Sequence, residues 1–280
     1  MISNKPDAIK GRLGFADIGG DFSRLSEFSQ GHGFELIQIN LDNPRHFPER
    51  YSAGERAEIK TRFAELGIGL CFHSPSDIPM MNRHESIRQA SLNRAFEMID
   101  LAADMGGEYF IFHPGRLAFY SLSLKKVVFM EQRFPERTSE LFADSLGRLL
   151  AHCKGKIELC IENTHEIATP FLNVIGDLVV RDGLGLVWDA GHTEQLIGSK
   201  RTQIVQFFQN HIGHVKLAHL HDIKNGISHK ALGSGGLNVS GYLEIFNALS
   251  IDVVLEIFPE SELVNSVDYL RKLNVVDKLS

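Results

Sequence analysis

Short apolar runs alternate with longer amphipathic segments along the chain, and this alternation constrains the fold more than any other feature. The runs are rich in β-branched and aromatic residues and span residues 13–16, 34–40, 68–73, 109–113, 157–162, 184–189, 215–219 and 253–257. An alternating order of strands and helices is typical of an α/β protein with a parallel sheet. Eight such units predict a closed barrel. We therefore expect one domain over residues 1–280, a single (β/α)8 TIM barrel with parallel strands and outer helices.

The pattern of apolar and polar residues within the individual segments supports this expectation. Residues 109–112 read Tyr-Phe-Ile-Phe, and consecutive apolar positions indicate a strand that is covered on both faces. Residues 85–105 and 137–153 place apolar side chains at three- and four-residue spacing among charged ones. That spacing predicts amphipathic helices outside the barrel. We expect residues 115–135, the longest stretch without a regular period, to form an irregular βα loop.

Composition excludes several classes of protein. The 280 residues carry a net charge of -6, which gives no basic field for indiscriminate nucleic-acid binding. No stretch approaches the roughly 20 apolar residues of a membrane span, and residues 1–11 lack the apolar run of a signal peptide. Cys71, Cys153 and Cys160 are too unevenly spaced for a zinc knuckle or a redox pair, so we expect reduced core thiols. These features predict a cytoplasmic protein without a membrane partner.

Polar residues end most of the predicted strands. They are His73, His113, Glu162, Asp189, His219 and Glu256. In a barrel these ends gather at one rim, where the active site lies. Any one of them could simply cap the next helix, but a cluster of carboxylates is costly to bury unless a cation neutralises it. The pattern therefore predicts a divalent metal site.

Residue type narrows the choice of metal. Glu162, Asp189, His219 and Glu256 form an oxygen-rich set that suits Mn²⁺, Mg²⁺ or Co²⁺ and also accepts Zn²⁺. Additional nitrogen ligands could come from His73, His113, His192 and His229. If these bind metal too, the balance moves towards zinc and towards more than one ion. His221 and Asp222 could instead support the ligands from behind or contact a substrate.

Two loop segments have both a structural and a functional interpretation. Residues 233–236 read Gly-Ser-Gly-Gly, which could cradle a phosphate, although a flexible turn is the more frequent meaning of such glycines. Residues 43–47 read Asn-Pro-Arg-His-Phe, which could insert into a duplex. A proline-containing βα loop is the more common explanation of that pattern.

Several of these pieces, taken in chain order, resemble the xylose-isomerase-like barrel superfamily. It includes sugar and sugar-phosphate isomerases and epimerases, and the endonuclease IV type of apurinic-site repair enzyme. The matching pieces are Phe112-His113-Pro114-Gly115, Ile161-Glu162-Asn163-Thr164, Trp188-Asp189-Ala190-Gly191-His192, Ala218-His219-Leu220-His221-Asp222, His229-Lys230-Ala231-Leu232-Gly233 and Leu255-Glu256. Each piece alone is weak, but the ordered set covers essentially the whole chain.

Resemblance to the isomerase and epimerase branch implies a single metal on Glu162, Asp189, His219 and Glu256. The two glutamates would be catalytic, one as general base and the other as proton donor, on opposite faces of a small sugar, sugar phosphate or polyol. Substrate contacts are then expected from the remaining polar residues of the rim. These are His73, His113, His192, His221, Asp222 and His229.

Resemblance to endonuclease IV implies up to three zinc ions. His73, His113 and Glu162 would hold one ion, the four-residue set a second, and His192 and His229 part of a third. Ile227 stands where that family has an aspartate, and isoleucine cannot bind metal. The stretch after Thr164 begins His-Glu-Ile rather than with small residues, and no tyrosine follows His73. These departures weaken the DNA-repair interpretation.

Three functional hypotheses follow from the sequence. The first is a divalent-metal-dependent isomerase or epimerase of a small sugar, sugar phosphate or polyol. The alternative is a phosphodiester hydrolase with two or three zinc ions, and only this hypothesis allows DNA as a partner. A barrel that keeps the ligands but only binds a small molecule is the third, because fold does not dictate function. The sequence leaves the oligomeric state open.

Overall fold

The computed structural model describes residues 7–113, 119–123, 126–129, 133–164 and 167–276. Eight parallel strands close into a barrel with the neighbour order β1-β12-β9-β8-β7-β4-β3-β2. They are β1 (Leu13–Ala16), β2 (Leu36–Asn40), β3 (Gly69–His73), β4 (Tyr109–Phe112), β7 (Glu158–Glu162), β8 (Gly185–Asp189), β9 (Val215–Leu220) and β12 (Asp252–Leu255). Pairing of β1 with β12 closes the ring, with Leu13 opposite Val253. The predicted (β/α)8 barrel is confirmed.

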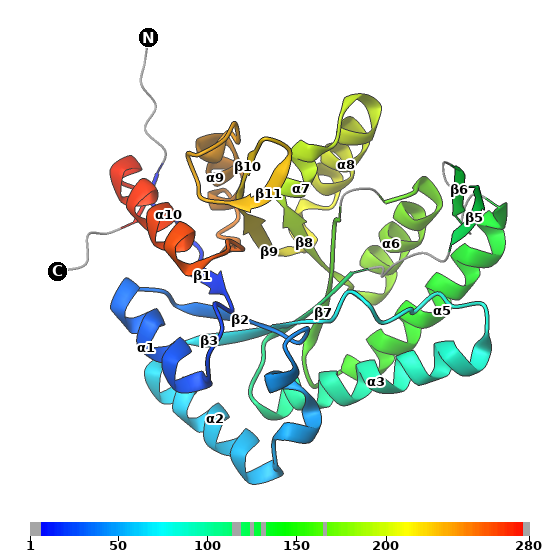
Figure 1. The fold of residues 1–280 in the computed structure, drawn as a ribbon, viewed down its shortest axis with the longest axis horizontal. Coiled ribbons are helices and arrows are strands. Elements are labelled where there is room, and N and C mark those ends of the chain that lie inside the picture. The colour runs from blue at the N-terminus through cyan, green and yellow to red at the C-terminus, as the bar shows by residue number, and fades with distance from the viewer. Residues whose placement is uncertain (1–6, 114–118, 124–125, 130–132, 165–166, 277–280) are drawn as a thin grey trace.

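Helices surround the barrel on its outer side (Figure 1). They are α1 (Phe22–His32), α2 (Ala53–Leu66), α3 (Glu85–Asp104), α5 (Pro135–Cys153), α6 (Thr169–Asp182), α7 (Ala190–Gln195), α8 (Gly198–Asn210), α9 (Val239–Asn247) and α10 (Glu260–Leu273), with short 3-10 helices η1 (Pro44–His46), η2 (Pro48–Arg50) and η3 (Ile212–His214). Within the described residues, none of the helices has the length and apolar character needed to cross a membrane.

Local sequence signals explain where α2 begins and ends. The Ser52 hydroxyl accepts the backbone N–H of Glu55, and the Glu55 carboxylate accepts the backbone N–H of Ser52 at 2.8 Å. This reciprocal capping box satisfies two amide groups that have no partner inside the helix. Gly67 ends the helix at φ 66°, a left-handed conformation that glycine adopts without strain.

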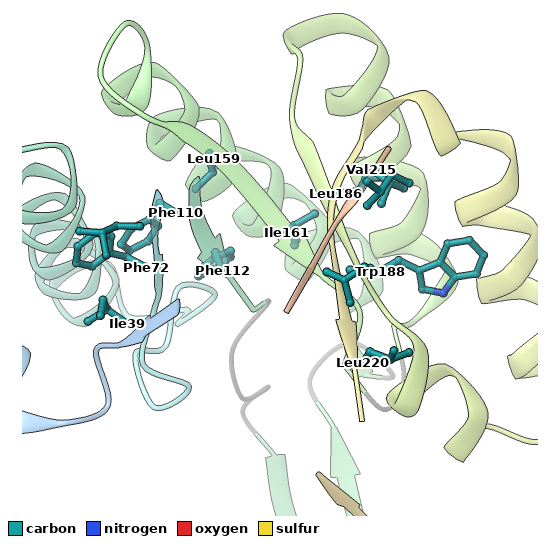
Figure 2. Packing of buried hydrophobic residues seen from close by; sticks show 14 of the residues in the cluster. Ile39, Phe72, Phe110, Phe112, Leu159, Ile161, Leu186, Trp188, Val215 and Leu220 are labelled. Carbon is teal, nitrogen blue, oxygen red and sulfur yellow. The ribbon is translucent and has the colours of Figure 1, made fainter. Parts of the chain in front are cut away.

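Apolar side chains fill two layers on either side of the strands. The inner layer takes one residue from each barrel strand: Ala16, Leu36, Cys71, Ile111, Cys160, Val187, Leu217 and Val254. Residues of opposite parity, such as Phe72, Phe110 and Trp188, face the helices instead (Figure 2). All three cysteines are buried and unpaired, as predicted. The barrel interior is therefore a packed core, and polar groups concentrate above it.

Two hairpins depart from the predicted elements. The stretch over residues 115–135, expected to be irregular, contains β5 (Phe119–Ser123) paired with β6 (Lys126–Phe129), so that expectation was wrong. After β9, the chain forms β10 (Asp222–Lys224) and β11 (Ile227–Lys230). These strands are three and four residues long, too short for a periodic signal to emerge. The second hairpin carries His229 at φ 56°, beside the barrel rim.

Candidate metal centre at the carboxyl ends of the strands

The strand register brings the predicted polar residues together. Asp189 on β8 lies opposite His219 on β9, and His219 lies opposite Val254, two residues before Glu256. Glu162 is the last residue of β7, which pairs with β8. Because all of these strands are parallel, their carboxyl ends share one rim.

Glu162, Asp189, His219 and Glu256 form one compact group whose ligand atoms all lie within 4.8 Å of one another. His219 Nδ1 is 3.2 Å from Glu162 Oε2, 3.4 Å from Glu256 Oε2 and 3.8 Å from Asp189 Oδ2. All four residues are buried, and none is more than 8% exposed. We refer to them as the four-residue cluster.

Two buried polar atoms of this cluster are consistent with a bound cation. Among the described residues, Glu162 Oε1 and His219 Nδ1 are buried side-chain atoms that make no hydrogen bond. An unsatisfied buried polar atom is costly, and a metal ion is one of the groups that satisfies it. One imidazole and three carboxylates form a donor set that accepts Mn²⁺, Mg²⁺, Co²⁺ or Zn²⁺.

His73, His113 and Glu162 form a second group with ligand spacing. The Nε2 atoms of the two histidines are 3.0 Å apart, and they lie 3.2 and 3.0 Å from Glu162 Oε2. His73 is buried at the end of β3, and His113 follows β4. Glu162 therefore belongs to both groups, and its Oε2 atom contacts imidazole nitrogens of each.

In four histidines one ring nitrogen, here called the outer one, is hydrogen-bonded to an oxygen of the protein. This bond determines which of the two ring nitrogens, outer or inner, carries the proton of the neutral ring. His73 Nδ1 lies 2.9 Å from the Ser74 carbonyl, and His219 Nε2 lies 2.7 Å from the Gln38 amide oxygen. His192 Nδ1 faces Gln195 Oε1 at 3.1 Å, and His229 Nδ1 faces the Glu256 carbonyl at 2.9 Å. These oxygens only accept, so in the neutral form of each ring the outer nitrogen carries the proton and the inner one keeps its lone pair. Metal-binding histidines are commonly oriented in this way.

His192, His221 and His229 form a third group with ligand spacing. Here His221 differs from the other histidines, because its Nδ1 accepts the backbone N–H of His229 at 3.0 Å. The proton of a neutral ring then lies on Nε2, which is 3.2 Å from Asp189 Oδ2. The ring packs on Gly191, where an added Cβ would lie 2.0 Å from it. His221 is thus placed to orient Asp189.

Asp222 is directed away from the rim and into the turn formed by residues 233–237. Its carboxylate accepts the backbone N–H groups of Ile223, Gly235 and Leu237 at 2.8 to 3.0 Å. The backbone of the glycine-rich segment is therefore partly occupied by this carboxylate. The structure favours the turn interpretation of residues 233–236 over the phosphate cradle. Residues 43–47 also form a local structure, because they contain η1 and the Asn43 side chain accepts the backbone N–H of Arg45.

Burial and mutual charge shift the titration of the centre. Burial opposes protonation of His219, but the carboxylates of Glu162 and Glu256 outweigh it and raise its pKa to about 10. Burial likewise opposes ionisation of Glu162, but the imidazoles of His219 and His113 hold its pKa well below the usual range. Burial lowers the pKa of His229. A proton on His219 and a metal ion therefore compete for the same atom.

Two amide residues of the centre were not predicted from the sequence. Asn163 bridges β7 and β8, because its side chain accepts the Asp189 N–H at 2.8 Å and donates to the Asp189 carbonyl at 3.0 Å. Gln38 on β2 contacts both His219 and Glu256. Gln38 could have been noticed in the sequence, because it is a polar residue inside an apolar run that predicts a buried strand. Residues 165 and 166, which follow the Glu162 segment, lie outside the described residues.

The fold and the rim together define a parallel (β/α)8 barrel with clustered candidate metal ligands at the carboxyl ends of its strands. The model of the family described as "Xylose isomerase-like TIM barrel" matches residues 27–273. The chain belongs to this family.

Similar proteins come from both functional branches. A probable endonuclease 4 of Mycobacterium marinum is 22% identical over 259 residues, which cover 88% of this chain and 94% of the relative. A D-tagatose 3-epimerase-like protein superposes with a TM-score of 0.72 at 17% identity, covering 94% and 97% of the two chains. Endonuclease IV from Thermus thermophilus superposes with a TM-score of 0.67 at 20% identity, covering 94% and 98%. At these identities the structural similarities show a common fold.

Proposed function

We propose that this protein is a metal-dependent hydrolase of phosphate esters whose centre holds at least two divalent ions. The observation that carries the proposal is the position of Glu162, which belongs to two candidate ligand groups and whose Oε2 atom lies within 3.2 Å of imidazole nitrogens of both. A carboxylate shared in this way is suited to bridge two ions. This ranking reverses the order that the sequence alone favoured.

The same position argues against Glu162 as a proton-transfer base. A general base works best when its pKa lies near the operating pH. Burial would raise the pKa of Glu162, but the surrounding imidazoles hold it well below the usual range of a carboxyl group. In the metal-free centre the carboxylate is therefore held in its ionised form, the form in which it binds a metal ion.

Each of the two ligand groups that share Glu162 would hold one ion. His73, His113 and Glu162 would hold one ion, and the four-residue cluster would hold the other. Divalent ions held there would acidify a bound water and neutralise charge on a phosphate ester. The rich supply of imidazole favours zinc for the first position. The name of the mycobacterial relative, an endonuclease, supports chemistry on a phosphodiester.

His192 and His229 lie next to this centre. The centroids of their two rings are 5.3 Å from each other. Their outer nitrogens are hydrogen-bonded to Gln195 Oε1 and to the Glu256 carbonyl, which places the proton of a neutral ring on the outer nitrogen. They would contact the substrate or contribute to a further ion. A neutral imidazole suits either role, and burial lowers the pKa of His229, which favours the neutral form of that ring.

A metal-dependent epimerase is the second candidate. It is favoured by the presence of two glutamates, Glu162 and Glu256, in one cluster, where each carboxylate lies within 3.4 Å of His219 Nδ1. In that case the four-residue cluster would hold one ion, and the two carboxylates would exchange a proton with a carbon next to a carbonyl. The epimerase-like structural neighbour is consistent with this alternative.

One experiment separates the candidates. Protein loaded with Zn²⁺ or Mn²⁺ is assayed for hydrolysis of bis(p-nitrophenyl) phosphate and of an oligonucleotide with an abasic site, and for deuterium uptake into ketoses in D₂O. We expect phosphoester hydrolysis that depends on His113, with no deuterium uptake. Deuterium uptake that requires Glu162 and Glu256 but not His113 would favour the epimerase and overturn the proposal.

A further inference from the structure

Gln38 is a polar residue in a position where a barrel normally carries an apolar one. Leu36, two residues earlier on β2, belongs to the inner apolar layer, and alternation places Gln38 on the same face, one step nearer the rim. Its side chain is fully buried. Burying an amide costs free energy unless all of its polar groups find partners.

Every polar group of this amide has a partner in or beside the four-residue cluster. Gln38 Oε1 accepts a hydrogen bond from His219 Nε2 at 2.7 Å. Gln38 Nε2 donates to Glu256 Oε1 at 3.1 Å and to Asn40 Oδ1 at 3.2 Å. The bond to Glu256 determines the orientation of the amide, because exchanging its oxygen and nitrogen would place the amide oxygen against the Glu256 carboxylate, which only accepts.

The bond to His219 selects the atom that faces the cluster. With its proton on Nε2 and bonded to Gln38, the neutral ring keeps its lone pair on Nδ1. Among the described residues, Nδ1 is one of the buried atoms that make no hydrogen bond, and it lies 3.2 Å from Glu162 Oε2 and 3.4 Å from Glu256 Oε2. The bond to Glu256 acts in the same sense, since it occupies Oε1 and leaves Oε2 directed at His219.

We propose that Gln38 is a positioning residue of the metal centre, which fixes Nδ1 of His219 as the ligand atom and directs Oε2 of Glu256 towards the same ion. The inference rests on the metal centre of the proposed function and not on the reaction. A failure of the hydrolase assay would therefore leave it untouched. Loss of an outer partner of a metal ligand typically weakens metal binding about 10- to 100-fold.

The test uses the full chain, stripped of metal and titrated with Co²⁺. Gln38→Met preserves the approximate shape of the side chain and removes all of its hydrogen bonds, whereas Gln38→Asn keeps the amide but withdraws it by one methylene. Gln38→Glu still offers an oxygen to His219. Asn247→Leu is the matched control, because Asn247 is a buried amide with bonds to Asp7, Ala8 and Lys10, before β1 and away from the rim.

We expect Gln38→Met and Gln38→Asn to raise the Co²⁺ dissociation constant about 10- to 100-fold and to change the Co²⁺ absorption spectrum, which reports coordination geometry. Gln38→Glu should recover at most part of the affinity, because it keeps an acceptor for His219 but sets a second carboxylate oxygen against Glu256. Asn247→Leu should lower only the melting temperature. An unchanged Co²⁺ affinity and spectrum in whichever of Gln38→Met and Gln38→Asn folds would overturn the proposal. Gln38 would then serve only to fill the barrel.

Discussion

Removal of His113 tests whether the two clusters hold separate ions. The imidazole is one of three candidate ligands in its own cluster and belongs to no other, whereas Glu162 is shared. Structural zinc sites with four ligands bind with roughly 10–16 kcal/mol, which corresponds to about 2.5–4 kcal/mol per ligand. Loss of one ligand should therefore raise the dissociation constant of that ion by roughly 10²- to 10³-fold.

The assay is metal analysis of His113→Ala by plasma mass spectrometry after dialysis against a weak chelator. We expect one ion per chain fewer than in the unaltered protein, with the four-residue cluster still loaded. His152→Ala is the control, since His152 also contacts a carboxylate, Asp100, at 3.0 Å, but on the outer helices. An equal loss of metal from both clusters, or no loss, would refute the idea of two separable positions.

Three further predictions concern residues at the rim and beside it. Glu256→Gln should abolish turnover if the protein is an enzyme of either kind, which a turnover assay checks. If the protein only binds its ligand, a binding titration should show that the variant keeps its affinity. The raised pKa of His219, about 10 against an ordinary 6.5, means that its proton stabilises the metal-free fold fully below pH 6.5 and less as the pH approaches 10. The melting temperature of stripped protein should accordingly fall between pH 7 and 10, and a flat profile would contradict this assignment. Asp222→Asn should lower the free energy of unfolding by about 1–3 kcal/mol in urea titrations, because an amide cannot accept all three N–H groups; metal content should stay constant, and a loss of metal would place Asp222 in the centre.

The barrel could be predicted because its signals are local and repeated. A buried parallel strand is apolar on consecutive positions, as in residues 109–112, and the strands fall within a few residues of the predicted ranges. The hairpin of β10 and β11 escaped prediction, since its pairing depends on the rim against which it packs. The assignment of the whole chain to one domain stays a prediction.

The candidate ligands could be predicted because each ends a strand, and the topology of a barrel then brings strand ends together. The roles of their neighbours could not. Nothing in the spacing shows that Asp222 faces a turn while His221 contacts Asp189. Gln38 is separated by 181 residues from His219, so only the closed barrel reveals that they touch. Hydrogen-bond direction, which fixes the imidazole lone pairs, needs three-dimensional coordinates.

The number of ions bound by the purified chain tests the central claim most directly. Plasma mass spectrometry of protein prepared without chelators, combined with protein quantification by amino-acid analysis, gives this ratio. A centre in which Glu162 is shared by two clusters predicts two or more divalent ions per chain, and one fewer in His113→Ala. A ratio of one ion per chain, unchanged by His113→Ala, would contradict the account and restore the single-metal epimerase as the better explanation.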